Sequence, residues 1–301
     1  MLDRACSSCY LKGMNRTTPE RRAQILGLMV EGASIRSICR LTGVSKNTVT
    51  KLLIDAGKAF AEYQDRTLRG LKSRRIQCDE IWSFVGMKER KVPAEMRGKI
   101  GQGDVWTWTA IDADSKLVPS WLVGKRDAGY AYAFMNDLAS RLTHRVQLTT
   151  DGHRAYLSAV EDVFGIDIDY AMLVKLYGAD ANEGAAHRYS PPKCIGAEPH
   201  NVTGNPDPEH ISTSYIERQN LTMRMGMRRF TRLTNAFSKK FENHVHAIAI
   251  YYMHYNFVRI HQTLRVTPCM EAGITTTPWT LIDMVRVLEE WEAMQAAQAR
   301  I

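Results

Sequence analysis

The middle of the chain constrains the fold most strongly, because strand-like and helical patterns alternate there. Residues 145–152 (RVQLTTDG) have the pattern of a strand that ends on an acid, and residues 153–165 (HRAYLSAVEDVFG) have that of a helix. A second strand is expected over residues 168–178 (IDYAMLVKLYG). Three earlier strands are expected, one in residues 74–86 and two around the turn DADSK, followed by a helix over residues 128–142. This order predicts an α/β domain with a mixed sheet.

An irregular segment follows over residues 179–211, and it is rich in Pro, Gly and Asn. Loops of this length are usually functional or mobile. Residues 213–232 (TSYIERQNLTMRMGMRRFTR) then resume a helical pattern, which Thr213 or Ser214 could cap. Residues 266–301 predict a C-terminal helical tail with an amphipathic helix, which could dock on the core or on another copy of the chain.

The basic charge is concentrated in two blocks. The formal net charge is +8, and residues 1–75 carry 15 Lys and Arg against 6 Asp and Glu. Residues 218–240 hold seven more basic residues and no acid. Segregated basic blocks on an otherwise neutral chain favour a polyanionic partner, nucleic acid before membrane. For either block taken alone, the alternative is a set of solvated helix faces.

The first block has the pattern of an all-α helix-turn-helix domain over residues 14–58. Gly32 and Gly43 separate three helical segments, and Ser34 and Ser45 are good N-caps for the second and third. Gly43 permits the positive φ that a tight turn needs. The third helix would then enter the major groove of DNA with its first turn. The residues expected to contact DNA there are Ser45, Lys46, Asn47, Thr50 and Lys51. A structural three-helix bundle is the alternative.

Composition argues against several other classes of protein. No apolar run reaches the ~18 residues that a membrane span needs, and the N-terminus lacks the apolar core of a signal peptide, so we expect a cytoplasmic protein. The six cysteines are scattered, unlike a disulfide framework. Cys6 and Cys9 form a lone CxxC without a second pair at zinc-ligand spacing, so zinc is not expected. Residues 1–13 are expected to be a disordered extension, and residues 59–75 a charged, partly helical linker.

Three acids stand where a sheet could bring them together. Asp79 lies inside the first strand, where Asp is disfavoured unless something requires it. Asp151 ends the fourth strand, which this strand order commonly places beside the first. Glu217 stands one turn into the helix after the long irregular segment. Taken singly, Asp151 could be a helix cap and Glu217 a partner of the helix dipole. Taken together, the three are better explained as a carboxylate triad.

Three strings around these acids resemble one protein family. CDEIWSFVG contains Asp79, TTDGHRAY contains Asp151, and SYIERQNLTMRMGMRRFTRLTNAFSKK contains Glu217. From about Met14 to Gly273, the chain resembles the bacterial DDE transposases of insertion-sequence elements, in particular the insertion-sequence-one family. The trailing YYMHYNFVRIHQTLRVTP resembles the segment that ends many integrase-type cores. Relatives in this family can carry a full N-terminal zinc finger, of which this chain offers half.

The resemblance implies a ribonuclease H-like (integrase-type) catalytic core over residues 76–265. In it Asp79, Asp151 and Glu217 would bind two Mg²⁺ (or Mn²⁺) ions, with Asp79 bridging them. The implied activity is metal-dependent cleavage of insertion-sequence ends and strand transfer into target DNA, by a homodimer or larger assembly on double-stranded DNA. Two alternatives stay open: an RNase H-like nuclease without strand transfer, and a helix-turn-helix repressor with an inert core.

The helix expected to carry Glu217 also begins the second basic block. The residues expected to hold DNA backbone near the metals are Arg218, Arg224, Arg228 and Arg229. Arg224 and Arg228 are four residues apart, so they would share one face of a helix and could follow a backbone together. Asn220 could contact the same substrate or be a solvated surface residue.

Overall fold

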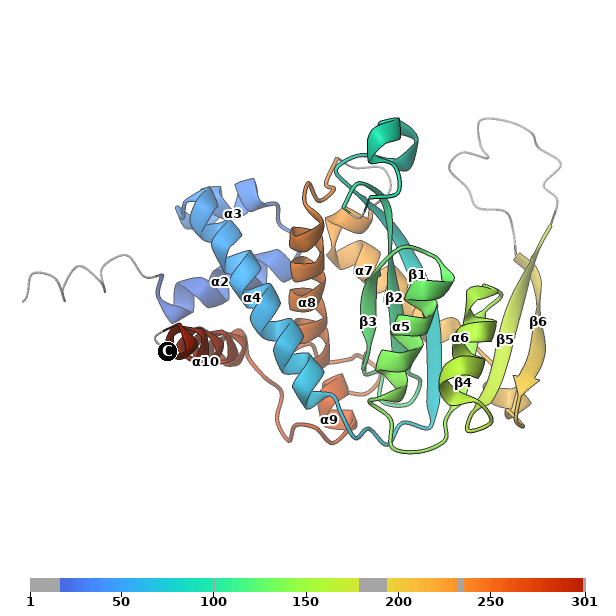
Figure 1. Cartoon of the computed structure of the whole chain (residues 1–301). Helices are drawn as coiled ribbons and strands as arrows, with labels where there is room; N and C mark the ends of the chain where they lie inside the picture. The colour runs from blue at the N-terminus through green and yellow to red at the C-terminus, as the bar shows by residue number, and fades with distance from the viewer. Residues whose placement is uncertain (1–16, 100, 179–193, 232–234, 300–301) are drawn as a thin grey trace, which may run out of the picture.

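The computed structural model describes residues 17–99, 101–178, 194–231 and 235–299. A six-stranded sheet lies on one side of the molecule (Figure 1). A group of helices from the N-terminal and C-terminal parts of the chain lies on the other side. Within the described residues no helix is long and apolar enough to cross a membrane. The predicted extension, residues 1–13, with its CxxC pair, lies outside the described residues.

The sheet has the strand order β3-β2-β1-β4-β5-β6. β1 is antiparallel to β2 and parallel to β4, β4 is parallel to β5, and the outer pairs β2–β3 and β5–β6 are antiparallel. The strands are β1 (Arg75–Val85), β2 (Gly103–Asp112), β3 (Trp121–Gly124), β4 (Gln147–Asp151), β5 (Asp169–Tyr177) and β6 (Cys194–Thr203). This mixed sheet is the predicted ribonuclease H-like core.

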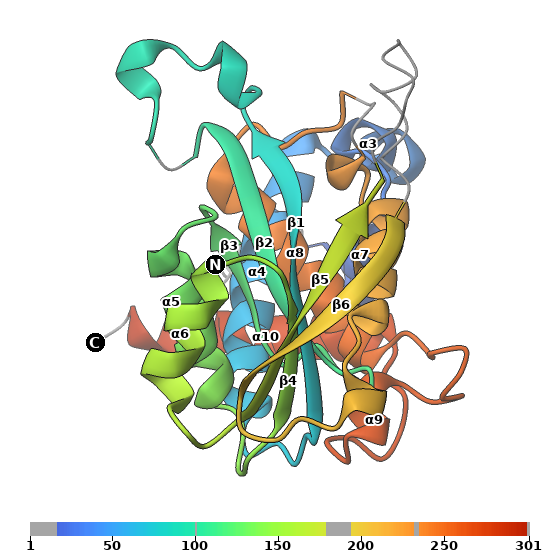
Figure 2. The ribbon, with the colours of Figure 1, turned by 90° about the vertical axis from the view of Figure 1, so that its right-hand side faces the viewer.

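Helices cover both faces of the sheet (Figures 1 and 2). On one face α5 (Ala128–Ala139) and α6 (Ala155–Phe164) lie side by side, and they share a hydrophobic core with the strands. On the other face α7 (Ser214–Gly226) and α8 (Phe241–Phe257) pack against the sheet. Successive residues of a strand point to opposite faces, so odd-numbered positions 77–83 of β1 face α7 and α8, and even-numbered positions face α5 and α6.

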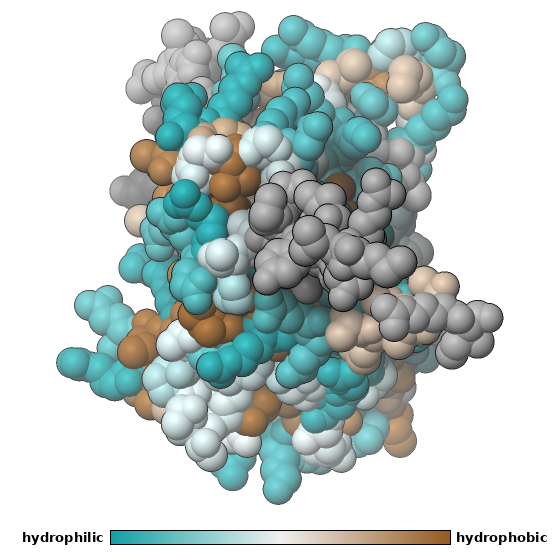
Figure 3. Space-filling model, turned by 90° about the vertical axis from the view of Figure 1, so that its left-hand side faces the viewer, coloured by the Kyte–Doolittle hydropathy of each residue, from teal (hydrophilic) through white to brown (hydrophobic). Residues whose placement is uncertain are grey.

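The remaining helices gather around α8. α4 packs along α8, and α10 packs against both α2 and α4. These helices are α2 (Pro19–Val30), α3 (Ile35–Thr42), α4 (Lys46–Thr67), α9 (Pro268–Glu271) and α10 (Leu281–Gln298). Short 3₁₀ turns lie between the larger elements at η1 (Glu89–Lys91), η2 (Ala94–Met96), η4 (Pro208–His210) and η5 (Arg228–Phe230). The predicted amphipathic helix of the tail, α10, therefore packs on its own chain. The surface on the side of these helices is mostly hydrophilic, with scattered hydrophobic residues (Figure 3).

The predicted boundaries of the N-terminal part do not coincide with breaks in the structure. The boundary placed after residue 58 falls inside α4, which continues without interruption to Thr67. One hydrophobic core includes residues of α2, α4, α7, α8 and α10 together. The helical linker expected over residues 59–75 is thus an extension of the third helix followed by a short connection to β1. The first helices and the catalytic core are packed as one body.

The irregular segment predicted over residues 179–211 contains a strand. Residues 179–193 lie outside the described residues, but Cys194–Thr203 pairs with β5 along its whole length as the edge strand β6. Most of its side chains are exposed, so the sequence has no buried–exposed alternation that would reveal it. It also contains Pro199, which is tolerated at a sheet edge because an edge strand has unpaired N–H positions.

A glycine sets the distance between the two central helices. A methyl group at Gly57 of α4 would come within 2.6 Å of His246 Cα on α8. That atom belongs to the backbone and cannot move away cheaply. In contrast, a methyl group at Gly27 of α2 would meet only the flexible end of Leu281, at 2.9 Å. Both glycines lie inside helices, where Gly costs about 1 kcal/mol relative to Ala.

The first prediction is that Gly57→Ala lowers the free energy of unfolding, although alanine is the better helix former. Overpacking of a tight contact typically costs about 1–3 kcal/mol. The matched change Gly27→Ala should be neutral or slightly stabilising. Thermal unfolding of the two variants measures the difference, and a Gly57→Ala melting temperature at or above that of Gly27→Ala would contradict the close approach of α4 and α8.

Candidate active site and DNA-binding elements

Three carboxylates meet where β1 and β4 lie side by side. The parallel register pairs Cys78 with Thr150, so Asp79 and Asp151 are the next residues on neighbouring strands. Glu80 follows on β1. One carboxylate oxygen from each of the three acids lies within 4.8 Å of the others. The sequence therefore predicted two members of this cluster, Asp79 and Asp151, and missed Glu80.

Asp79 is held by two hydrogen bonds on the α7 side of the sheet. The backbone N–H of Glu80 donates to Asp79 Oδ1 at 2.8 Å, and Asn220 Nδ2 of α7 donates to Asp79 Oδ2 at 2.8 Å. Burial, together with the negative charges of Asp151 and Glu217, raises the pKa of Asp79 to about 6, although the two hydrogen bonds act to lower it. Asn220 is buried rather than a solvated surface residue, and it touches the acid itself.

Glu80 lies on the opposite face of β1, with a side chain only 1% exposed. Its Oε2 accepts from Arg126 Nε at 3.0 Å, and the same guanidinium lies 3.6 Å from Asp151 Oδ2. Burial, followed by the charge of Asp151, raises the pKa of Glu80 to about 7. Arg126 also lies over the ring of Trp106, 4.8 Å from its centroid. One arginine thus partly neutralises two of the three clustered acids.

Asp151 is not the N-cap of α6. α6 begins at Ala155, four residues on, and Arg154 in the N-cap position makes no side-chain capping bond. Asp151 Oδ1 instead accepts from the N–H of His153 at 3.0 Å, which closes a tight turn at the end of β4. The strand end and this turn together aim the carboxylate at the cluster.

Glu217 approaches the cluster from α7 but is not part of it. Lys175 Nζ of β5 lies 2.5 Å from Glu217 Oε1, and the hydroxyl of Thr213 donates to the same oxygen. Glu217 is still close enough to raise the pKa of Asp79 by its charge. The structure therefore brings Asp79 and Asp151 together and places Glu217 beside them, with its charge taken up by a lysine. No local sequence pattern marks Lys175, because its contact with Glu217 depends on the register of β5.

These side chains fit a divalent cation. The pKa values of Asp79 and Glu80 are raised although Arg126 lies beside Glu80 and Asp151, and a divalent ion would supply the further positive charge that stabilises the ionised carboxylates. Oxygen donors of this kind suit Mg²⁺ and Mn²⁺.

The predicted turn of the N-terminal helices is present. Gly43 has φ 70° after α3, and Ser45 Oγ caps α4 by accepting from the N–H of Thr48 at 3.2 Å. Lys46 and Asn47 are exposed in the first turn of α4. Thr50 is half-buried, and Lys51 is exposed and pairs with Asp55 one turn further on. The first turn of α4 is therefore open to a partner.

The predicted DNA-backbone arginines do not share one helix. α7 ends at Gly226, so Arg228 and Arg229 lie in the 3₁₀ turn η5, and the shared helix face of Arg224 and Arg228 was wrong. Arg229 is turned inward: it donates to Ser238 Oγ at 2.7 Å and to the carbonyl of Asn243 at 3.2 Å. Burial lowers the pKa of Arg229 to about 10. Arg229 thus serves the fold and was wrongly assigned to the DNA path, whereas Arg218 is exposed on α7.

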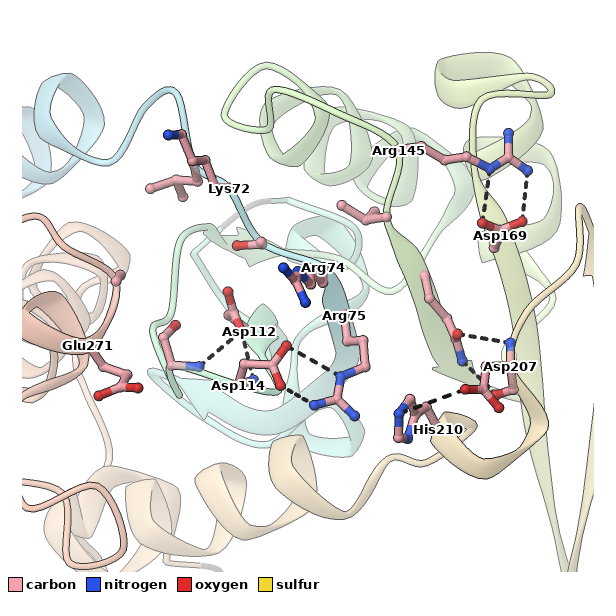
Figure 4. Close-up of a pocket in the computed structure, with 16 residues that line it drawn as sticks. Lys72, Arg74, Arg75, Asp112, Asp114, Arg145, Asp169, Asp207, His210 and Glu271 are labelled. Carbon is pink, nitrogen blue, oxygen red and sulfur yellow. Dashed lines mark hydrogen bonds and ion pairs between the residues drawn. The ribbon is translucent and has the colours of Figure 1, made fainter.

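A cavity of about 860 Å³ lies at the other end of the strands, away from the acids (Figure 4). It is lined by the starts of β1, β4 and β5 and by the turn after β2. Its charges largely satisfy one another, because Arg75 pairs with Asp114, and Arg145 forms two hydrogen bonds with Asp169. None of the predicted catalytic or DNA-binding residues lines it.

Two family models match parts of the chain. Residues 95–193 match a model described as a DDE domain, named for a transposase, and residues 16–53 match a homeodomain-like domain. Residues 95–193 are therefore similar to a DDE transposase domain. Domains of this kind are enzymes that use divalent metals, and the homeodomain-like match agrees with DNA binding by the N-terminal helices. The DDE match includes Asp151 but not Asp79 or Glu217, so the roles of individual residues rest on geometry.

The chain has low sequence identity to the solved structures that it resembles. No curated protein matches the chain. Among solved structures, the chain is similar to a simian T-cell lymphotropic virus intasome (11% identity, 86% of this chain and 77% of that chain, TM-score 0.39). It is also similar to a piggyBac transposase synaptic complex (10%, 91% and 71%, 0.35) and to a Mos1 transposase paired-end complex (14%, 52% and 59%, 0.21).

The second prediction concerns the stability of the metal-free protein against pH. The native state raises the pKa of Asp79 from 3.8 to about 6, so it disfavours the ionised carboxylate. The corresponding stability is present below about pH 4 and is lost as the pH rises through about 6. Asp79→Asn removes that charge. The melting temperature of Asp79→Asn minus that of the unchanged protein should therefore increase as the pH is raised from 4.5 to 7.5 in EDTA.

The neighbour of Asp79 can accommodate the substitution, and an exposed aspartate provides a control. Asn220 Oδ1 is buried without a hydrogen-bond partner in the described part of the chain, so a turned Asn220 amide can accept from an asparagine at position 79. Asp167→Asn is the control, because the Asp167 side chain is 80% exposed. If the difference in melting temperature between Asp79→Asn and the unchanged protein were as independent of pH as the difference for Asp167→Asn, there would be no repulsion within the cluster.

Proposed function

We propose that this protein is a transposase that binds the ends of an insertion sequence, cleaves them, and joins the freed 3′-ends to target DNA. The observation that carries the proposal is the meeting of Asp79 and Asp151 at the β1–β4 boundary, with Glu217 delivered beside them by α7. The DDE domain match supports the class of reaction. The motifs around these acids resemble those of the insertion-sequence-one family.

Asp79, Asp151 and Glu217 would hold two Mg²⁺ or Mn²⁺ ions, with Asp79 between them. Such a pair stabilises both the attacking and the leaving oxygen of a phosphodiester in an in-line displacement. Glu217 would exchange its contact with Lys175 for this role. Glu80 would hold Arg126 beside the cluster, where the guanidinium can meet a phosphate oxygen.

DNA would reach the acids from two sides. Ser45, Lys46, Asn47, Thr50 and Lys51, at the N-cap and in the first two turns of α4, would read the element end. Arg218, Arg224 and Arg228 would contact the backbone near Glu217. Arg218 supports this most directly, since it is exposed one residue after Glu217. Joining two ends requires at least two active sites, so we expect a dimer or larger assembly on DNA, acting on the nucleoid in the cytoplasm.

The third prediction is that Asp79→Asn, Asp151→Asn and Glu217→Gln each abolish cleavage while DNA binding is kept. Each change keeps the shape of the side chain but removes a charge that a metal needs. The full chain is incubated with Mg²⁺ and duplex DNA from the borders of its element, and cleaved ends are mapped. Asp114→Asn, a paired acid of the distant cavity, is the control and should cleave normally.

The same reaction separates the alternatives. Joining of a pre-cut end to target DNA distinguishes a transposase from a nuclease that only cuts. A repressor would bind the ends and leave them intact at every Mg²⁺ concentration. If any one of the three acid variants nicked DNA at the normal rate, that acid would have no place in the site.

The fourth prediction is that Lys46→Ala or Asn47→Ala reduces the preference of the full chain for element-end DNA over random DNA. Base contacts of a recognition helix are each worth about 1–3 kcal/mol of discrimination, which corresponds to roughly 5- to 150-fold. Lys58→Ala removes an exposed lysine three turns along the same helix and should leave the preference unchanged. Equal preference in all three variants would reduce the first turn of α4 to a structural element.

A further inference from the structure

The strand that carries Asp79 also holds the helix that carries Glu217. Gln77 lies two residues before Asp79 on the same face of β1, and it is only 3% exposed. Its Oε1 accepts from the N–H of Tyr215 at 2.9 Å and from the N–H of Ile216 at 3.1 Å. These are the second and third residues of α7. The side chain of a distant strand thus caps this helix.

The helix needs this cap, because its own N-cap residue does not supply one. The first turn of a helix has N–H groups without partners inside the helix. Thr213 in the N-cap position accepts no capping bond within the described chain, and its hydroxyl donates to Glu217 instead. Ser212 Oγ accepts from the N–H of Ser214 at 3.1 Å, which leaves the next two N–H groups to Gln77.

A second bond joins the same two elements one turn later. Asn220 Nδ2 donates to Asp79 Oδ2 at 2.8 Å. Gln77 therefore holds the start of α7, Asn220 holds its second turn, and Glu217 lies between the two attachments. Both attachments start from β1 on the side that faces α7. The first two turns of α7, which carry Glu217, are thereby held against β1 by protein contacts before any cation is bound.

We propose that Gln77 is a positioning residue: by capping α7 from β1, it fixes the carboxylate of Glu217 relative to that of Asp79 and so sets the affinity of the site for its divalent cations. The inference rests on the proposed role of Glu217 as a ligand. Outer contacts that orient metal ligands typically change metal affinity by about 10- to 100-fold when they are removed.

Another buried glutamine provides a matched control. Gln64 of α4 is also 3% exposed, and its Nε2 donates to the carbonyls of Phe60 at 2.9 Å and Ala249 at 3.1 Å. It joins α4 to α8, away from the acids. Gln77→Met and Gln64→Met each remove two hydrogen bonds from a buried site at similar side-chain volume. A purely structural role would make the two variants alike.

The experiment uses the full chain and begins without metal. Hydrogen exchange should lose protection at the amides of Tyr215 and Ile216 in Gln77→Met and keep it in Gln64→Met. Gln77→Glu retains an acceptor oxygen and should keep this protection. Free Mn²⁺ is then measured by electron paramagnetic resonance during titration in the absence of DNA. Gln77→Met should bind Mn²⁺ about 10-fold more weakly, and Gln64→Met should bind it as the unchanged protein does.

Cleavage as a function of Mg²⁺ completes the test. In Gln77→Met the Mg²⁺ concentration for half-maximal cleavage should rise about 10-fold, with activity recovering at high Mg²⁺. Equal Mn²⁺ affinity in Gln77→Met and Gln64→Met would overturn the proposal. If Gln77→Met does not fold, Gln77→Asn, which withdraws the amide by one methylene, takes its place with the same expected results.

Glu217→Gln separates this inference from the proposed function. If Glu217→Gln binds Mn²⁺ and cleaves normally, Glu217 is not a ligand, and the proposed site fails. If Glu217→Gln loses both properties while Gln77→Met behaves like Gln64→Met, the site stands and only the positioning role of Gln77 fails.

Discussion

The repulsion among carboxylates packed at the junction of β1 and β4 is the constraint on which the rest of the structure depends. Asp79, Glu80 and Asp151 lie within reach of one cation, and burial together with their mutual charge raises the pKa of Asp79 and of Glu80. A fold keeps such an arrangement only if other groups offset it. Arg126 does so for Glu80 and Asp151, and Lys175 does so for Glu217. A bound metal ion would replace part of the positive charge that Arg126 and Lys175 supply to these acids.

The surrounding elements hold this cluster in place. β1 delivers acids to both faces of the sheet, because successive side chains alternate. The turn after β4 is closed by Asp151 itself. α7 is attached to β1 through Gln77 and Asn220 and to the neighbouring α8 through the hydrogen bond that Gln219 donates to the Tyr251 hydroxyl. Since α8 also packs against α4, the N-terminal helices are joined to the site through a continuous hydrophobic core rather than through a flexible linker.

The sequence predicted those parts of the fold and site that have a local pattern. β4 and β5 follow from apolar runs bounded by turns, and Asp79 stands out because an acid is unusual inside a strand. Glu80 was missed, since only the register of β1 against β4 shows that both neighbouring acids matter. Gln77 and Lys175 have partners far along the chain, which no local pattern reveals. Arg229 was misplaced because a basic residue has the same sequence signature whether it faces solvent or turns inward, and β6 was missed because it is exposed.

The central claim is that this acid cluster is a divalent-metal site, and anomalous scattering from Mn²⁺ in crystals of the full chain tests it most directly. The account predicts Mn²⁺ bound by Asp79 and Asp151 and also by Asp79 and Glu217, with Lys175 moved away from Glu217. Manganese bound only elsewhere, for example in the cavity lined by Arg75 and Asp114, with Asp79 and Asp151 unliganded, would contradict it.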